Sequence, residues 1–271
     1  MNKRSREIPL FSHPIIETHF HLDMLKSLSR DEIVEKCLKQ NIEKMITIST
    51  SAKNLDEVIF IAETYSNIYC TQGLHPHDGK EWNENVRVHL LSNLNDPTKN
   101  KKIVAVGEIG LDYYYSKSPQ QEQIIAFEEQ LQIAVDYNLP VVIHSRDADE
   151  DTIAVLKNFS TLLNRKGVIH SFTSGLGLAE FALGAGFYLG FNGIITFKNA
   201  ENVRDALRMT PANRILLETD SPFLTPDPYR GTENAPFYLP FIAEKIAEVK
   251  SLTLENILIH CYQNSIDLFK F

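Results

Sequence analysis

Four histidines, one glutamate and one aspartate stand at the ends of short apolar runs in this sequence. They are His19, His21, Glu108, His144, His170 and Asp220. Imidazole nitrogens and carboxylate oxygens are ligands that divalent metals accept. Each preceding run is typical of a buried strand, and side chains alternate along a strand, so His19 and His21 lie on the same side. Six such residues at one place in a repeating unit favour a metal centre over separate buried polar groups.

The order of the strands divides these residues between two ions. His19, His21 and Asp220 follow the first and last strands and predict the ligands of one ion. His144 and His170 follow neighbouring strands and predict a second site, and Glu108 lies between the two groups in strand order, where its oxygens could bridge. Two-metal hydrolytic sites hold their ions about 3.5–4 Å apart. The two carboxylates leave two divalent ions with a net positive charge, which attracts a phosphodiester. The imidazoles suit zinc (Zn), manganese (Mn), iron or cobalt, and the carboxylates also admit magnesium (Mg).

Eight apolar runs position these residues and alternate with amphipathic stretches. The predicted strands lie near Ile15–His21, Lys44–Thr50, Ile68–Leu74, Ile103–Glu108, Pro140–His144, Gly167–Ser171, Gly186–Phe191 and Arg214–Thr219. The predicted helices lie near Asp31–Lys39, Leu55–Tyr65, Pro119–Tyr137, Asp151–Leu163, Leu176–Leu183, Ala200–Met209, Pro240–Val249 and Leu254–Phe269, with Thr253 as the cap of the last. This alternation predicts an α/β fold, an eight-stranded parallel TIM barrel, with an open doubly wound sheet as the alternative. Only a closed barrel brings the ends of the first and eighth strands together. We expect a single metal-dependent hydrolase domain over residues 1–271, with the irregular stretch Ser221–Phe237 forming a loop over the site.

The composition is that of an ordinary globular protein with an acidic balance. The formal net charge is −8, which argues against affinity for nucleic acid through a general basic surface, although nucleic acid held locally at a metal site is compatible with it. Cys37, Cys70 and Cys261 form no Cys-x-x-Cys pair and predict reduced thiols in a cytoplasmic protein. The basic start Met1–Arg6 is not followed by a long apolar region, so we expect neither a signal peptide nor a membrane-spanning segment.

The segments around the candidate ligands resemble the TatD-related deoxyribonucleases, which are metal-dependent hydrolases of the amidohydrolase type. The matching segments are Thr18–Asp23, Gly73–His77, Gly107–Tyr114, His144–Ala148, His170–Thr173 and Glu218–Pro226, and the resemblance extends from about Ile15 to Phe269. It implies an eight-stranded barrel and a metal-dependent nuclease, commonly exonucleolytic on DNA. It also implies the same two ligand sets, with Glu108 shared by both ions.

The sequence departs from the family pattern in three places. Glu17 stands where the family usually has aspartate. The family's basic loop Arg-Gly-Lys-Arg-Asn-Glu-Pro appears here as Arg230–Pro236, with Thr232, Glu233 and Ala235 in place of two basic residues and one glutamate. Near the end of the chain, Asp267 stands where an arginine follows the family's asparagine, here Asn264. The lost positive charges affect the contacts expected between this loop and a nucleic acid.

Further residues near the strand ends are candidates for substrate contacts. His75 ends the third strand and either contacts substrate or packs, whereas His77 is expected to orient a ligand. Arg146 follows His144 by two residues and fits a phosphate contact or a surface ion pair with Asp147 or Asp149. Arg230 is the remaining candidate for substrate binding. Asp112 either holds a ligand or caps a turn, and Tyr113–Tyr115 either stack on bases or pack.

These patterns predict a divalent-metal-dependent hydrolase, favouring an exonuclease-like deoxyribonuclease that cleaves phosphodiester bonds with a metal-activated hydroxide. Glu108 and Asp220 are the candidate catalytic residues, with Asp220 as the base. The main alternative is a deacylase or amidohydrolase acting on a carbonyl substrate such as D-aminoacyl-tRNA. A non-catalytic binding module is disfavoured by the complete ligand set. We expect nucleic acid, DNA in particular, as the substrate, and neither a membrane nor an obligate protein partner.

Overall fold

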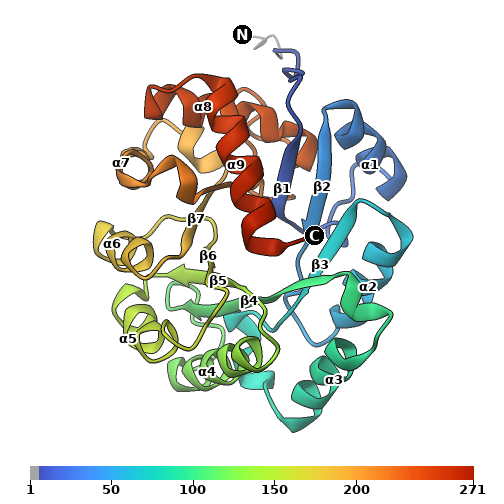
Figure 1. Cartoon of the computed structure of the whole chain (residues 1–271), viewed down its shortest axis with the longest axis vertical. Coiled ribbons are helices and arrows are strands. Elements are labelled where there is room, and N and C mark those ends of the chain that lie inside the picture. Colours follow the sequence, from blue (N-terminus) through green and yellow to red (C-terminus); the bar gives the residue numbers. More distant parts are fainter. Residues whose placement is uncertain (1–5) are drawn as a thin grey trace.

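A computed structural model describes residues 6–271, in which eight parallel strands form a barrel enclosed by helices (Figure 1). The strands pair in chain order: β1 (Ile15–Phe20), β2 (Ile42–Thr47), β3 (Ile68–Gln72), β4 (Ile103–Asp112), β5 (Val141–Arg146), β6 (Gly167–Ile169), β7 (Tyr188–Phe191) and β8 (Ile215–Leu217). Beyond β8, the Asp220 N–H donates to the His19 carbonyl at 2.9 Å and the His21 N–H donates to the Ser221 carbonyl at 2.8 Å. These bonds join the two edges of the sheet. The predicted barrel is therefore confirmed, and the open sheet is wrong. Residues 1–5, which include Lys3 and Arg4 of the basic start, lie outside the described part of the chain.

The helices occupy the stretches that the amphipathic patterns predict, with one addition. They are α1 (Arg30–Lys39), α2 (Leu55–Thr64), α3 (Glu84–Asn95), α4 (Gln120–Asp136), α5 (Asp149–Phe159), α6 (Leu176–Gly184), α7 (Glu201–Met209), α8 (Leu239–Lys250) and α9 (Leu254–Phe269). The Thr253 hydroxyl accepts the Asn256 N–H at 3.3 Å, which confirms the predicted cap. The sequence analysis missed α3, which buries only Leu90, Asn93 and Leu94 and has a weak apolar face.

Alternating side chains fill the inside of the barrel. One buried apolar cluster joins residues of several strands to the end of α9: Ile46, Ile48, Val104, Ala105, Val142, Val168, Tyr188, Leu216, Leu268 and Phe269. Side chains two positions apart in a strand point to the same side. His144 therefore points to the inside of the barrel like Val142, and His170 does so like Val168. The apolar interior therefore forms the base on which the candidate site is built. Figure 1 shows α9 in red lying across the ring of strands.

A break in the register of β4 places Glu108. Gly107 pairs with Val142 and Ile109 with Ile143, so Glu108 is an extra residue in the ladder between β4 and β5. Such a bulge redirects a side chain without ending the strand. The sequence analysis expected β4 to end at Glu108, but the strand continues to Asp112, which pairs with Arg146. The continuation of β4 beyond the bulge brings Asp112 to the same end of the barrel as the candidate ligands.

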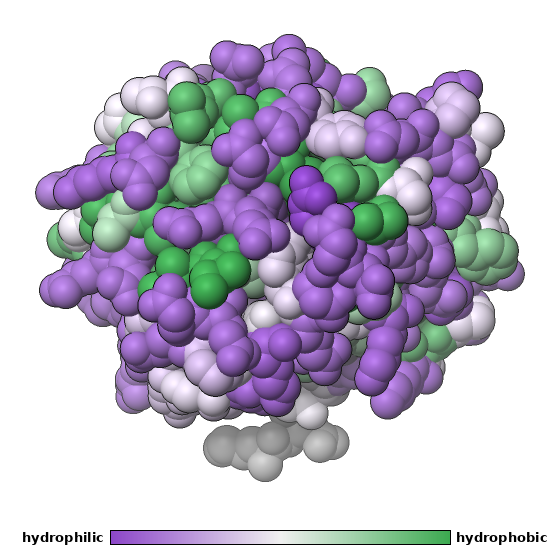
Figure 2. Space-filling view, turned by 90° about the horizontal axis from the view of Figure 1, so that it is seen from below, coloured by the Kyte–Doolittle hydropathy of each residue, from purple (hydrophilic) through white to green (hydrophobic). Residues whose placement is uncertain are grey.

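The surface and the cysteines agree with the composition. Figure 2 shows a face covered mainly by hydrophilic residues, with apolar side chains gathered in small separate groups. Within residues 6–271, no helix combines the length and apolar character needed to cross a membrane. Cys37, Cys70 and Cys261 are buried and unpaired.

We predict that Asn264→Ala destabilises the fold because Asn264 fastens α9 to the last strand. Its buried side-chain amide donates to the carbonyls of Ala212 at 2.9 Å and Ile215 at 2.8 Å. Losing two such bonds should lower the free energy of unfolding by about 1–3 kcal/mol. Chemical denaturation measures the loss, with the exposed Asn256→Ala on the same helix as the matched control. Equal stability of the two variants would contradict this role.

Candidate metal centre

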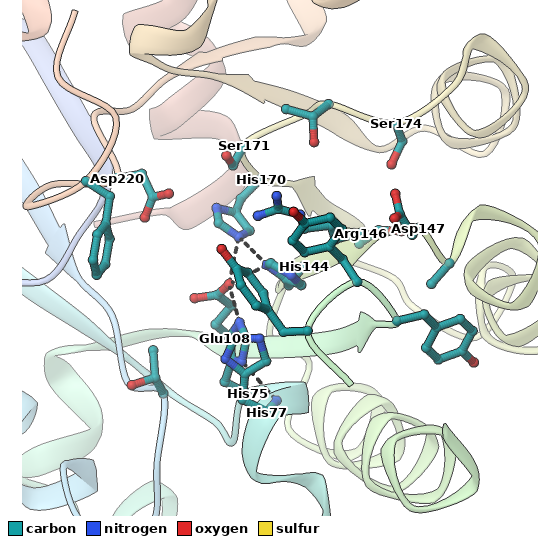
Figure 3. Close-up of a pocket in the computed structure, with 18 of the residues that line it drawn as sticks. His75, His77, Glu108, His144, Arg146, Asp147, His170, Ser171, Ser174 and Asp220 are labelled. Carbon is teal, nitrogen blue, oxygen red and sulfur yellow. Dashed lines mark hydrogen bonds and ion pairs between the residues drawn. The ribbon is translucent and has the colours of Figure 1, made fainter. Parts of the chain in front are cut away.

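The six candidate ligands converge at the carboxyl ends of the strands, as the sequence analysis expected. Figure 3 labels four of them, Glu108, His144, His170 and Asp220. Five of them line a cavity of about 1410 Å³: His21, Glu108, His144, His170 and Asp220. His19 is fully buried, and its ring stacks on that of His170, with centroids 3.9 Å apart and planes 4° apart. The residues form the floor of a cavity that is open to larger molecules.

Glu108 lies at the centre of this floor. Its Oε1 is 2.7 Å from His170 Nε2, 3.0 Å from His144 Nδ1 and 3.3 Å from His75 Nε2. Its other oxygen, Oε2, is 3.5 Å from His19 Nε2. Each oxygen of one carboxylate therefore faces a different set of imidazoles, which is the geometry that a bridging ligand requires.

Asp220 completes the group on the other side. Its Oδ1 is 3.3 Å from His21 Nε2 and 3.7 Å from His19 Nε2. In Figure 3, Asp220 and Arg146 lie on opposite sides of His170 and Glu108. The two groups of ligand atoms that the strand order predicts are thus present and meet at Glu108.

Asp112 orients the imidazole of His144. Asp112 Oδ2 is 3.0 Å from His144 Nε2 and 3.0 Å from His77 Nε2, while Oδ1 accepts the Tyr115 N–H at 2.8 Å. With a proton on Nε2 bonded to the carboxylate, His144 turns the lone pair of Nδ1 towards Glu108. Both interpretations of Asp112, as a residue that holds a candidate ligand and as a turn cap, are consistent with this geometry.

His75 differs from the other histidines in its hydrogen bonding. Its Nδ1 accepts the backbone N–H of His77 at 3.0 Å. A neutral imidazole that accepts at Nδ1 carries its proton on Nε2, and this atom faces Glu108. His75 is therefore arranged as a hydrogen-bond donor to Glu108. Among the described residues, no comparable hydrogen bond fixes a proton on the nitrogens that His144 and His170 direct towards the same oxygen.

Two buried carboxyls lie beneath the histidines, and the sequence analysis did not identify their roles. Glu17 Oε1 accepts the N–H groups of His19 and Thr219, each at 3.0 Å. Glu218 accepts the N–H of Ser171, and its Oε1 is 3.9 Å from His170 Nδ1. The absence of a side chain at Gly190 makes room for it, because an added Cβ would lie 2.1 Å from Glu218 Oε2. Alternation with Leu216 and Asp220 is the signal that could have placed Glu218 on the inner face.

Burial and charge separate the carboxyl groups into two kinds. Burial raises the pKa of Glu17 to about 8 and that of Glu218 well above its usual range, so both are neutral acids at pH 7. Burial acts on Glu108 in the same direction, but His170 and His75 outweigh it and hold its pKa well below the usual range. The bond to His21 similarly outweighs burial and lowers the pKa of Asp220. The site therefore presents two carboxylates to a cation and keeps two neutral carboxyls below them.

The imidazoles show the corresponding pattern. Burial lowers the pKa of His19 and of His75 to about 4, so both rings are neutral at pH 7. For His144, bonds to Asp112 and Glu108 outweigh burial and raise the pKa to about 9. The neutral rings have a nitrogen lone pair available, as metal ligation requires, whereas His144 must release a proton when it binds a metal.

Several buried nitrogens of this site have no hydrogen-bond partner in the described part of the protein, which fits a site that binds a cation. Both ring nitrogens of His19 and the Nδ1 atoms of His21 and His170 are buried without a hydrogen bond. Unpartnered buried polar atoms are costly and uncommon. Ligand atoms lie within 4.8 Å of one another in several groups, which include His19, His21 and Asp220; His19, His170 and Glu218; and His75, Glu108 and His144. The donor set of the floor is thus suited to metal ions.

The candidate substrate contacts are only partly at this site. His75 and Arg146 line the cavity. The Arg146 guanidinium lies over the ring of Tyr114, 4.1 Å from its centroid, and the ion pairs of residues 6–271 include none between Arg146 and Asp147 or Asp149. Arg230 lies outside the central cavity and lines a smaller adjoining pocket, with its guanidinium 3.6 Å from the ring centroid of Phe197.

The loop Ser221–Phe237 meets the cavity at its start rather than along its length. Phe223 and Leu224 line the cavity, whereas Glu233 does not. Glu233 Oε1 instead accepts the N–H groups of Lys26 and Ser27, each at 3.0 Å. The glutamate that replaces a basic residue of the family therefore joins this loop to the segment after β1.

Comparison with known proteins was consistent with this geometry. The family model described as TatD related DNase matches residues 16–270. The metal-dependent hydrolase YabD of Bacillus subtilis is 35% identical over 257 residues, which cover 94% of this chain and 99% of YabD. The protein named 3′-5′ ssDNA/RNA exonuclease TatD of Erwinia amylovora is 31% identical, with 89% of this chain and 93% of that protein covered. The crystal structure of YjjV, a TatD homologue from Escherichia coli K12, superposes with a TM-score of 0.86 at 31% identity and covers 95% of this chain and 98% of that chain.

We predict that Glu17→Ala destabilises the protein far more than Glu17→Gln. Alanine leaves the buried N–H groups of His19 and Thr219 without an acceptor, which should cost about 2–6 kcal/mol. Glutamine keeps an acceptor oxygen and imitates the neutral carboxyl, so its cost should stay below about 1 kcal/mol. Chemical denaturation of the metal-free variants measures both values. Equal losses would mean that the carboxyl does not act through these two bonds.

Proposed function

Because the chain belongs to the family of TatD-related DNases, and is thereby a metal-dependent hydrolase, we propose that it is an exonuclease-like nuclease that cleaves phosphodiester bonds of DNA at the floor of this cavity. The observation that carries the proposal is Glu108, whose two oxygens face His19 on one side and His144 and His170 on the other. A carboxylate shared in this way supports two metal ions in one site. The unpaired, buried cysteines support a cytoplasmic location.

Two ligand sets follow from these distances. His19, His21 and Asp220, with Glu108 Oε2, would hold one ion. Glu108 Oε1, His144 Nδ1 and His170 Nε2 would hold the other, and these atoms lie 2.7–3.3 Å from one another. We assign His170 rather than His75 to the second ion because the bond from His77 gives His75 a proton on Nε2. The imidazole-rich set suits zinc or manganese, and the carboxylates also admit magnesium.

The protein side chains supply positioning and proton transfer around the ions. When bound, such ions lower the pKa of water and stabilise charge on phosphoryl oxygens. Asp220 Oδ1 faces His19 and His21, which leaves Oδ2 to take the proton of the attacking water. His75 Nε2 would donate to an oxygen of the phosphate, and Arg146 would contact a neighbouring phosphate from the wall of the cavity.

The proposed function is tested with the purified protein and Glu108→Ala. The protein is loaded with Mg, Mn or Zn and given labelled single-stranded DNA, duplex DNA, RNA and aminoacyl-tRNA. We expect release of nucleotides from an end of DNA, and we expect Glu108→Ala to reduce the rate by at least about 10²–10³-fold through lost electrostatic stabilisation. Glu150→Ala, which removes a carboxylate from the same cavity, is the matched control and should keep the activity.

The substrates in this assay separate the proposal from its alternative. A failure to release nucleotides from any nucleic acid by the metal-loaded protein would overturn it. Release of the amino acid from aminoacyl-tRNA, with the nucleic acid left intact, would support a deacylase acting on a carbonyl group.

We predict that Asp112→Asn weakens metal binding because an amide no longer holds the His144 imidazole by a charged hydrogen bond. Residues that orient metal ligands typically contribute 10–100-fold to affinity, and we expect a loss of about this size for one of two ions. Titration calorimetry on the metal-free protein, together with metal analysis after dialysis, measures it. Asp147→Asn, in the same cavity and without such a contact, is the control. Unchanged metal affinity in Asp112→Asn would mean that Asp112 only caps the turn at Tyr115 and does not support a metal ligand.

A further inference from the structure

Exposed aromatic side chains are concentrated at the cavity. Within residues 6–271, large aromatic side chains are exposed at four positions, and three of them line the cavity: Tyr114 at 59%, Tyr115 at 52% and Phe223 at 52% exposure. The fourth, Phe60, is 60% exposed on α2, away from the cavity. Burying an exposed aromatic ring against an apolar ligand surface lowers the free energy, because it removes apolar surface from water. Three such rings around one catalytic floor indicate a ligand with flat apolar faces.

The two tyrosines form an ordered group on one side of the metal centre. The Arg146 guanidinium carbon lies 4.1 Å from the Tyr114 centroid and 4.9 Å from the Tyr115 centroid, and the two rings meet edge to face at 4.9 Å. The Tyr115 ring also meets His77 edge to face at 5.3 Å. Asp112 links this group to the floor, since it accepts the Tyr115 N–H and bonds to His144. The tyrosine side is therefore fixed relative to the candidate ligands.

Phe223 is fixed on the opposite side. Its N–H donates to the Asp220 carbonyl at 3.0 Å, and its ring lies 6.2 Å from that of His21. Asp220 and Arg146 flank His170 and Glu108 from two sides in Figure 3. The aromatic surfaces thus stand on both sides of the place where a scissile phosphate would lie.

The charges of the cavity wall point to the bases, rather than the phosphates, of a nucleic acid. Apart from the candidate ligands, the lining contains five acidic residues, Asp78, Asp147, Asp149, Glu150 and Asp151, and two basic residues, Lys117 and Arg146. A wall of this composition does not attract a run of phosphates. Aromatic rings and a guanidinium plane can stack on any base, whatever its sequence.

We propose that Tyr114 and Tyr115, against which Arg146 packs, on one side, and Phe223, on the other, are base-stacking positions that flank the scissile phosphate and select an unpaired end of a single-stranded nucleic acid. This inference rests on the proposed function and specifies its substrate. In a duplex the bases stack on one another within the helix, so a blunt end must open before it can use these rings. DNA and RNA present the same bases to them.

The test combines changes in the enzyme with changes in the substrate. Single-stranded oligonucleotides, in DNA and RNA form, carry either ordinary nucleotides or abasic residues at the two positions nearest the cleaved end. A blunt DNA duplex of the same sequence is the third substrate. The enzymes are the wild type, Tyr114→Leu, Phe223→Leu, Tyr114→Phe, which keeps the ring, and Phe60→Leu, which removes an exposed ring elsewhere. Metal content and melting temperature of every variant are measured first.

The expected results follow from the strength of stacking. Loss of one stacked base should reduce kcat/KM about 5- to 150-fold. We expect this loss for the wild type on abasic ends, and for Tyr114→Leu and Phe223→Leu on ordinary ends, with DNA and RNA affected alike. Abasic ends should cost each of those two variants less than they cost the wild type, because one of the partner rings is already absent. Phe60→Leu should behave as the wild type, Tyr114→Phe should lose much less than Tyr114→Leu because it keeps the ring, and the blunt duplex should be the poorest substrate.

The contrary outcomes are distinct from a failure of the proposed function. If the wild type cleaves ordinary and abasic ends equally, or if the leucine variants lose the same further factor on abasic ends as the wild type does, the stacking positions do not exist. Equal cleavage of blunt duplex and single strand would also overturn the selection. If the wild type cleaves none of the nucleic acids, the proposed function itself fails. Should a leucine variant not fold, the wild-type comparison of ordinary and abasic ends still decides.

Discussion

Glu108 carries a negative charge in the interior of the molecule, and the placement of that charge governs the arrangement around it. Four imidazole nitrogens lie within 3.5 Å of its two oxygens. A buried carboxylate is tolerated only where such partners or cations compensate for the lost hydration. The register break in β4 directs the side chain to this position, and β1, β5 and β6 bring their histidines to the same point. Strands from different parts of the barrel thus meet, through their histidines, around the single charge of Glu108.

The interior of the barrel is graded from apolar to charged along its axis. The cluster containing Val142, Val168 and Leu216 is apolar, and the next inward positions along these strands are His144, His170 and Glu218. Because Glu17 and Glu218 are neutral at pH 7, the layer beneath the histidines adds hydrogen-bond acceptors without adding charge. Glu17, which bonds to backbone N–H groups next to β1 and β8, therefore lies in a different layer from Glu108 and Asp220, the carboxylates that face the cavity. Residues at the carboxyl ends of barrel strands can then serve chemistry while the layer below serves stability.

The periodic features of the chain predicted the barrel and the gathering of the six candidate ligands, because both depend on regular alternation. The features that were missed depend on local exceptions to it. Strand β4 contains a bulge at Glu108 and continues to Asp112, and a bulge leaves no trace in the apolar pattern. Helix α3 was missed because its apolar face is narrow. The position of Arg230, outside the central cavity, is determined by an irregular loop, and the stacking of Arg146 on Tyr114 is determined by side-chain packing. Neither follows from spacing along the chain.

The contribution of α9 to the barrel interior bears on the order in which the molecule can assemble. Leu268 and Phe269 belong to the same buried cluster as Ile46, Val104 and Leu216, although they follow the last strand by a whole pair of helices. During synthesis on the ribosome, the strands emerge before the residues that close their inner cluster. Until then the inner faces of the strands remain accessible to water and to other chains, as is general for folding intermediates of larger proteins. The inner apolar cluster is therefore complete only after α9 has been synthesised and has docked.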